Sequence, residues 1–260
     1  MVPERPARMG PILMRNRDTS LGGAGVNFAE TVWGMVERAR AATPEARQAG
    51  LEELARAYWK PVYHYLRVAW AKSNEDAKDL AQAFFLWLTD RNALERYAPE
   101  RGSFRTFLKA LLRHFVQHHD EALDRLKRGG GRVLVALDTG EASLGSVLPD
   151  PKAQSPDEAF EREWKNALMA AAVERVRRRL SSGGAGVKFR VFEAYYLDVA
   201  PEERPTYAAV AGRLGVKEGE IKHYLCDVRE EVRNEIREQL AQTLSKPEDF
   251  QEEWNAFFSA

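Results

Sequence analysis

The stretch Ser103-Phe-Arg-Thr-Phe-Leu-Lys-Ala-Leu-Leu-Arg-His-Phe-Val116 carries the strongest helical pattern in the chain. Its apolar residues recur at intervals of three and four, which places them on one face of a helix. A serine, whose hydroxyl can accept a backbone hydrogen bond at a helix start, precedes them. We therefore predict a long amphipathic helix here, with an apolar face made of Phe104, Phe107, Leu108, Leu111, Leu112, Phe115 and Val116.

Helical patterns continue on both sides of this stretch. Thr43-Pro44-Glu45 predicts one helix start, and Pro61 interrupts the pattern that follows it. Ser73 with Asp76 resembles a capping box, ahead of an apolar stripe at Leu80, Ala81, Phe84 and Leu88. Later helical patterns cover about 156–180, 189–196, 207–214 and 218–240, and no strand alternation interrupts them. The predicted fold class is all-α.

Breaks in the helical pattern divide the chain into segments. Gly129-Gly130-Gly131 ends the first helical block, and the next segment is rich in Gly, Pro, Ser and Asp without a lasting period. We predict two helical domains joined by a flexible linker. The expected parts are a mobile tail at 1–26, a first domain at 27–132, the linker at 133–157, a second domain at 158–245 and an amphipathic tail at 246–260.

Charge and composition narrow the class of protein. The formal net charge is zero, but residues 101–132 hold eight basic and three acidic side chains, a local charge of about +5. The chain lacks an apolar run long enough to span a bilayer, and its N-terminus does not resemble a secretory signal. The single cysteine, Cys226, cannot form an intrachain disulfide. We expect a cytoplasmic protein without a membrane partner.

A helix–turn–helix pattern lies near the C-terminus. Thr206 can cap a short helix with a core face at Ala208, Val210, Ala211 and Leu214, and Gly215 supplies the tight turn before the next helix. In this arrangement the second helix can enter a DNA major groove. An ordinary helical hairpin fits the same spacing, and the acids of the second helix favour that alternative.

Two further polar faces are candidates for binding. Arg113, His114, Gln117 and His118 share a face of the long helix and suit phosphate and base-edge contacts. A metal site is the competing interpretation, because His114, His118, His119 and Asp120 cluster in sequence. On the preceding helix, Asp79, Gln82 and Leu86 form a mixed polar and apolar face suited to docking a partner helix.

Sequence signatures of catalysis are missing. The chain has no nucleophile elbow, Walker loop, dinucleotide fingerprint or zinc-protease motif. We therefore expect a protein that is not an enzyme and that uses neither a metal nor another cofactor. A metal-dependent enzyme is the weakest of the alternatives.

Three segments, in this order and spacing, resemble motifs of the extracytoplasmic-function sigma factors. Asp76-Ala-Lys-Asp-Leu-Ala-Gln82 resembles DAEDLxQ in the core-polymerase-binding helix, and Arg101-Gly-Ser-Phe-Arg-Thr-Phe-Leu108 resembles the RGxFRxWL segment before the −10-recognition helix. Leu214-Gly-Val-Lys-Glu-Gly-Glu-Ile-Lys222 resembles LGxSEGTVK at the −35-reading helix. The resemblance covers residues 28–245. It implies a sigma factor with core RNA polymerase and promoter DNA as partners; a sigma-like DNA-binding regulator or decoy that does not initiate transcription is the alternative.

The resemblance also assigns residues to roles. Core polymerase would be bound by Asp76, Asp79, Gln82 and Phe85. The −10 element would be contacted by Arg101, Gly102, Ser103, Arg113, His114, Gln117, His118, Lys127 and Arg128. The −35 element would be contacted by Lys222, His223, Tyr224 and Arg229. The chain departs from the usual family residues at Lys78, Ala83, His114, Lys217, Glu220, His223, Tyr224, Cys226 and Asp227.

The C-terminal tail exceeds what a minimal sigma factor needs. Phe250, Trp254, Phe257 and Phe258 would share one face of a helix, and such a face should be buried. Two interpretations are open. The tail packs structurally on the chain's own helices, or it docks between the two domains and inhibits the protein in place of an anti-sigma factor.

Overall fold

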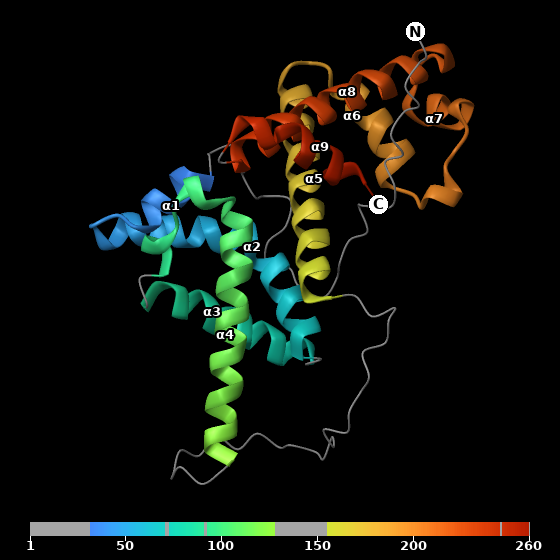
Figure 1. The fold of residues 1–260 in the computed structure, drawn as a ribbon. Coiled ribbons are helices and arrows are strands. Elements are labelled where there is room, and N and C mark those ends of the chain that lie inside the picture. The colour runs from blue at the N-terminus through green and yellow to red at the C-terminus, as the bar shows by residue number, and fades with distance from the viewer. Residues whose placement is uncertain (1–31, 71–72, 91–92, 128–154, 245, 260) are drawn as a thin grey trace.

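The computed structural model describes residues 32–70, 73–90, 93–127, 155–244 and 246–259. Within these ranges the chain forms nine α-helices, short 3₁₀ segments and one π-helical turn, and it contains no strand (Figure 1). The predicted all-α class is confirmed to that extent. The helices are α1 Val32–Ala39, α2 Pro44–Trp70, α3 Asn74–Asp90, α4 Phe104–Lys127, α5 Pro156–Ser182, α6 Gly186–Phe192, α7 Tyr207–Leu214, α8 Glu218–Thr243 and α9 Phe250–Phe258.

Side-chain caps start four of these helices. The Ser73 hydroxyl accepts a hydrogen bond from the Asp76 amide at 3.2 Å, and the Ser103 hydroxyl accepts one from Thr106 at 3.3 Å. Ser155 and Glu158 form a capping box at the start of α5, and these hydrogen bonds lower the pKa of Glu158. The predicted caps at Ser73 and Ser103 are therefore confirmed, and Thr206 caps α7 as expected.

The interruption expected at Pro61 does not end a helix. α2 runs through it for 27 residues, although a proline leaves the carbonyl four residues earlier without its usual partner. Val62, Tyr63 and Leu66, which follow it, are completely buried. Tertiary packing of this apolar face therefore outweighs the local cost of the proline.

α5 lies at the centre of the structure. It packs against α2 on one side and against α6 and α8 on the other, as Figure 1 shows. Tyr58 of α2 lies edge-on to Phe104 of α4 with 5.3 Å between ring centroids, and it stacks at 6.5 Å on Phe160 of α5. Burial raises the pKa of the Tyr58 hydroxyl far above its usual range.

One apolar core extends from Met35 to Phe257 among the described residues. It therefore passes through both predicted domains, and the boundary between them stays a prediction. The predicted mobile tail at 1–26 lies outside the described residues, as does the linker up to residue 154.

The turn between α7 and α8 forms as the sequence predicts. Gly215 has a φ of +67°, a left-handed conformation that glycine adopts at little cost, and α8 begins three residues later. Val210 and Ala211 are buried and Leu214 is half-buried. The prediction for Ala208 was wrong: it is exposed, because the face of α7 that meets α8 is narrower than the apolar pattern.

The amphipathic tail is a helix with its aromatic face turned inward. In α9 the side chains of Trp254 and Phe257 are buried, and those of Phe250 and Phe258 are half-buried. The expected burial of this face is confirmed. None of the described helices is long and apolar enough to cross a membrane.

Candidate functional site

The outer face of α3 is exposed and mixes polar with apolar side chains. Asp79, Gln82 and Leu86 lie there, because Ala77, Ala81, Phe84 and Leu88 turn toward the core. Leu86 keeps 61% of its surface exposed, the most of any large hydrophobic side chain in the described residues. This face therefore places one exposed leucine beside a carboxylate and an amide, as the sequence predicts.

Two of the residues assigned to this face have other contacts. The Asp76 carboxylate accepts a hydrogen bond from the Ser73 hydroxyl at 2.8 Å, so it belongs to the helix cap. Phe85 is half-buried and stacks on Trp59 of α2 with 6.0 Å between ring centroids. Phe85 therefore lies at the edge of the face and Asp79, Gln82 and Leu86 at its centre.

The turn before α4 combines an exposed cation with a special backbone conformation. Arg101 ends a short 3₁₀ segment, η2 (Pro99–Arg101), and its side chain is exposed. Gly102 has a φ of +133°, which other residues rarely adopt. The Ser103 hydroxyl is engaged by Thr106 in the cap, so this side chain serves helix α4.

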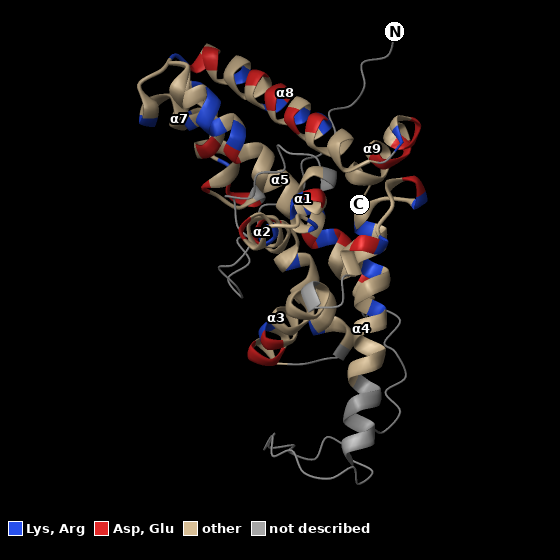
Figure 2. Cartoon of the chain, turned by 90° about the vertical axis from the view of Figure 1, so that its left-hand side faces the viewer, with Lys and Arg blue, Asp and Glu red and all other residues tan. Residues whose placement is uncertain are grey.

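A row of cations spaced four residues apart on α4 faces α5. Arg105 pairs with Glu161 at 3.2 Å, and Lys109 pairs with the same carboxylate at 2.6 Å. Arg113 donates to Asp157, in the first turn of α5. Figure 2 shows the blue Lys and Arg positions along this part of α4. The sequence analysis predicts that Arg113 faces DNA, whereas in the structure its side chain donates to Asp157 of the chain itself.

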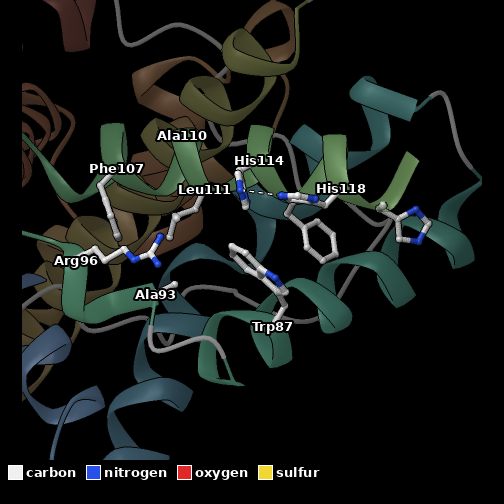
Figure 3. A pocket seen from close by; sticks show the side chains of 10 residues that line it. Trp87, Ala93, Arg96, Phe107, Ala110, Leu111, His114 and His118 are labelled. Carbon is white, nitrogen blue, oxygen red and sulfur yellow. Dashed lines mark hydrogen bonds between the residues drawn. The ribbon is translucent and has the colours of Figure 1, made fainter. Parts of the chain in front are cut away.

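An aromatic pocket of about 760 Å³ opens where α3 meets α4 (Figure 3). Its walls include Trp87, Arg96 and Phe107, and it is completed by His114, Phe115 and His118. The His114 and Trp87 rings lie 5.9 Å apart between centroids, and the Nε2 atoms of His114 and His118 are 2.9 Å apart. The pocket offers flat ring faces beside hydrogen-bonding nitrogens and the Arg96 guanidinium.

The residues predicted on the polar face of α4 do not all line the pocket. His114 and His118 line the pocket, while Gln117 is exposed and is not part of its wall. Trp87 and Arg96 were missed, since they come from other elements. The one sequence signal for Trp87 was its position as an aromatic residue next to the buried apolar stripe of α3. Lys127 ends α4 with a side chain outside the described residues, and Arg128 lies outside them altogether.

The competing metal interpretation finds no geometric support in the described part of the chain. No group of three or more His, Cys, Asp or Glu side chains there could hold a metal ion. The side chain of Asp120 lies outside that part. His114 and His118 contact each other instead, which requires one ring to donate and the other to accept.

The first turns of α8 present two exposed polar side chains, Lys222 and His223. Tyr224 is half-buried, and the Lys188 ammonium lies 5.9 Å from its ring centroid. A hydrogen bond of 2.7 Å to Asp227 raises the pKa of Lys188. Arg229 bends back to the Leu225 carbonyl at 3.2 Å and to the Cys226 sulfur at 3.1 Å. Of the four residues assigned to this helix, Lys222 and His223 are thus the ones that point freely outward.

Acidic side chains share the surface of α8 with these cations. Figure 2 shows red and blue positions alternating along the helix. Glu235 is buried between α8 and α5, where it pairs with Arg175 at 2.9 Å and Arg179 at 3.3 Å. Glu235 therefore holds the C-terminal half of α8 against α5, while Lys222 is exposed in the N-terminal half.

Comparison of the chain with protein-family models, with curated proteins and with solved structures gave no match.

Proposed function

We propose that the chain is a sigma factor of the extracytoplasmic-function type, which binds core RNA polymerase and directs it to promoters. The proposal rests on the positions of the three family-like segments in the structure. Each segment exposes polar side chains that a partner could contact. They are Asp79 and Gln82 on α3, Arg101 before α4 and Lys222 on α8.

The face of α3 is proposed to bind the polymerase. Leu86 would contribute buried apolar area, and Asp79 and Gln82 would set orientation through polar contacts around it. Interfaces commonly combine an apolar centre with a polar rim in this way. The face is free of other described elements, so binding would not require α3 to move.

The pocket between α3 and α4 is proposed to take an unstacked base of the −10 element. A promoter can be read as single strand only if a base leaves the stack and finds a binding site. The rings of Trp87 and His114 suit stacking, which contributes about 1–3 kcal/mol per base. Arg113 would exchange its Asp157 partner for a phosphate when DNA arrives.

The C-terminal pair α7 and α8 is proposed to act as a helix-turn-helix on the −35 element. Lys222 and His223 lie in the second helix close to the turn at Gly215, where such helices contact base edges. Arg229 would have to leave its contacts with Leu225 and Cys226 to reach a phosphate. In this proposal residues 27–132 and 158–245 are the two promoter-reading domains, and 133–157 connect them.

The proposal is tested by titrating purified core RNA polymerase with the chain. We expect a saturable complex, and we expect the double variant Asp79→Arg, Gln82→Ala to fold normally and lose it. A matched variant, Glu37→Arg with Gln48→Ala, changes charge and amide content equally at exposed positions outside α3. Equal affinity of wild type and the Asp79, Gln82 variant for core would contradict the assignment of this face.

A further inference from the structure

The C-terminal segment faces the turn that precedes α4. A polar cleft of about 360 Å³ separates them. From the turn it is lined by Glu100, Arg101, Gly102 and Ser103, and from the C-terminal segment by Lys246, Asp249, Glu252 and Glu253. The tail therefore presents three carboxylates to a turn that the family resemblance assigns to the −10 element of DNA.

Arg105 of α4 makes a direct contact with the C-terminal segment. Its Nη2 atom donates to both oxygens of Glu253 at 2.8 Å, and its guanidinium lies 4.0 Å from the Trp164 ring centroid. The side chain of Arg105 is only 12% exposed, so Glu253 occupies donors that solvent hardly reaches. The N–H groups of a guanidinium bind phosphate in the same way as they bind a carboxylate, so a carboxylate and a phosphate would compete for Arg105.

Buried aromatic side chains and cations of α5 and α8 hold α9 in place. Trp254 and Phe257 are buried; Arg233 and Arg237 of α8 lie over the Trp254 ring, at 5.5 and 5.0 Å from its centroid. Phe257 lies edge-on to Trp164 at 6.2 Å, and Lys165 donates to the Ala256 carbonyl at 2.6 Å. A nine-residue helix is marginal without such contacts. The contacts of α9 with α5 and α8 are separate from the α2–α5 packing, so the release of α9 would leave that packing intact.

We propose that α9 is an intramolecular competitor of nucleic acid: its carboxylates occupy the Arg101–Arg105 site in the free chain, and backbone phosphates of DNA replace them. The proposal rests on the proposed function, because it takes the turn before α4 as a DNA contact. It adds Arg105 as a phosphate-binding residue. Because the two ligands exclude each other, coupling between them is reciprocal: releasing α9 strengthens DNA binding, and DNA binding releases α9.

The first arm measures DNA binding by the free, full-length chain. The probe is a fluorescent forked duplex with a single-stranded arm of mixed sequence, since phosphate contacts do not depend on sequence. Trp254→Ala removes the anchor without a change in charge, and we expect it to tighten binding by roughly fivefold or more. Glu253→Gln should tighten binding more than Glu238→Gln, a matched charge change at an exposed position of α8.

The second arm measures hydrogen exchange of the α9 amides in the wild-type chain. We expect the probe to accelerate exchange across 250–258 while it slows exchange near 101–113. The inference is overturned if the probe binds, α9 exchange is unchanged and both variants keep the wild-type affinity; the proposed function would survive that result. If neither the wild type nor the variants bind the probe, alone or with core polymerase, the inference and the proposed DNA contact fail together.

Discussion

Replacing His114 with alanine tests the base-binding pocket with little risk to the fold. His114 is exposed on α4, and its contacts are the rings of Trp87 at 5.9 Å and His118 at 4.2 Å between centroids. The substitution removes one wall of the pocket but leaves the core packing unchanged. We expect the free energy of unfolding to change by less than about 0.5 kcal/mol.

The effect should fall on promoter melting. Losing one stacking partner costs about 1–3 kcal/mol, which corresponds to roughly a 5- to 150-fold decrease in the open-complex equilibrium. The closed complex precedes base capture, so its affinity should stay the same. Permanganate footprinting of the holoenzyme measures the open state, and a mobility-shift titration at low temperature measures the closed state.

Gln117→Ala is the matched control. Gln117 lies on the same helix and is equally exposed, but it is not part of the pocket wall. We expect holoenzyme with Gln117→Ala to melt promoters to nearly the same extent as the wild type. Normal permanganate reactivity in the His114 variant, or a larger defect in the Gln117 variant, would refute the assignment of the pocket.

Three further predictions concern the C-terminal helices. Gly215→Ala should lower the free energy of unfolding by about 1 kcal/mol, because the φ of Gly215 is +67°. Gly212→Ala should instead raise it by about 0.5–1 kcal/mol, because Gly212 lies inside α7 and alanine favours a helix more than glycine does. Chemical denaturation measures both changes. Glu235→Ala removes a buried carboxylate that pairs with two arginines, so it should lower the free energy of unfolding by about 2 kcal/mol. The loss is limited to this size because the arginines can turn to water, and calorimetry would show a Tm lower by several degrees. An unchanged Tm would contradict that ion-pair role. Lys222→Ala and His223→Ala should each reduce discrimination at the −35 element by about 1–3 kcal/mol in competition binding, and an unchanged promoter preference would place base reading elsewhere.

Much of the local structure could be predicted because its causes are local. Ser103 and Thr206 precede apolar patterns at helical spacing, and both cap helices that begin at the next residue. Gly215 takes the left-handed turn for which glycine is suited. The four aromatics of the tail share a face because their spacing is that of a helix, and the structure buries two of them and half-buries the other two.

Contacts between distant elements could not be predicted from patterns. Arg113 belongs to the polar face of α4, but nothing near it in sequence indicates that Asp157, 44 residues later, accepts its hydrogen bond. Glu253 meets Arg105 across 148 residues for the same reason. Trp87 and His114 line one pocket only because α3 and α4 pack together. Periodicity fixes which face of a helix is buried, whereas the partner of that face depends on the whole fold.

Run-off transcription with core RNA polymerase on a library of genomic promoter fragments tests the central claim most directly. The account predicts discrete transcripts that require the chain, share upstream elements and disappear with the Asp79→Arg, Gln82→Ala variant. Binding to core polymerase and to DNA without any chain-dependent transcript would contradict it, and would instead identify a sigma-like regulator or decoy.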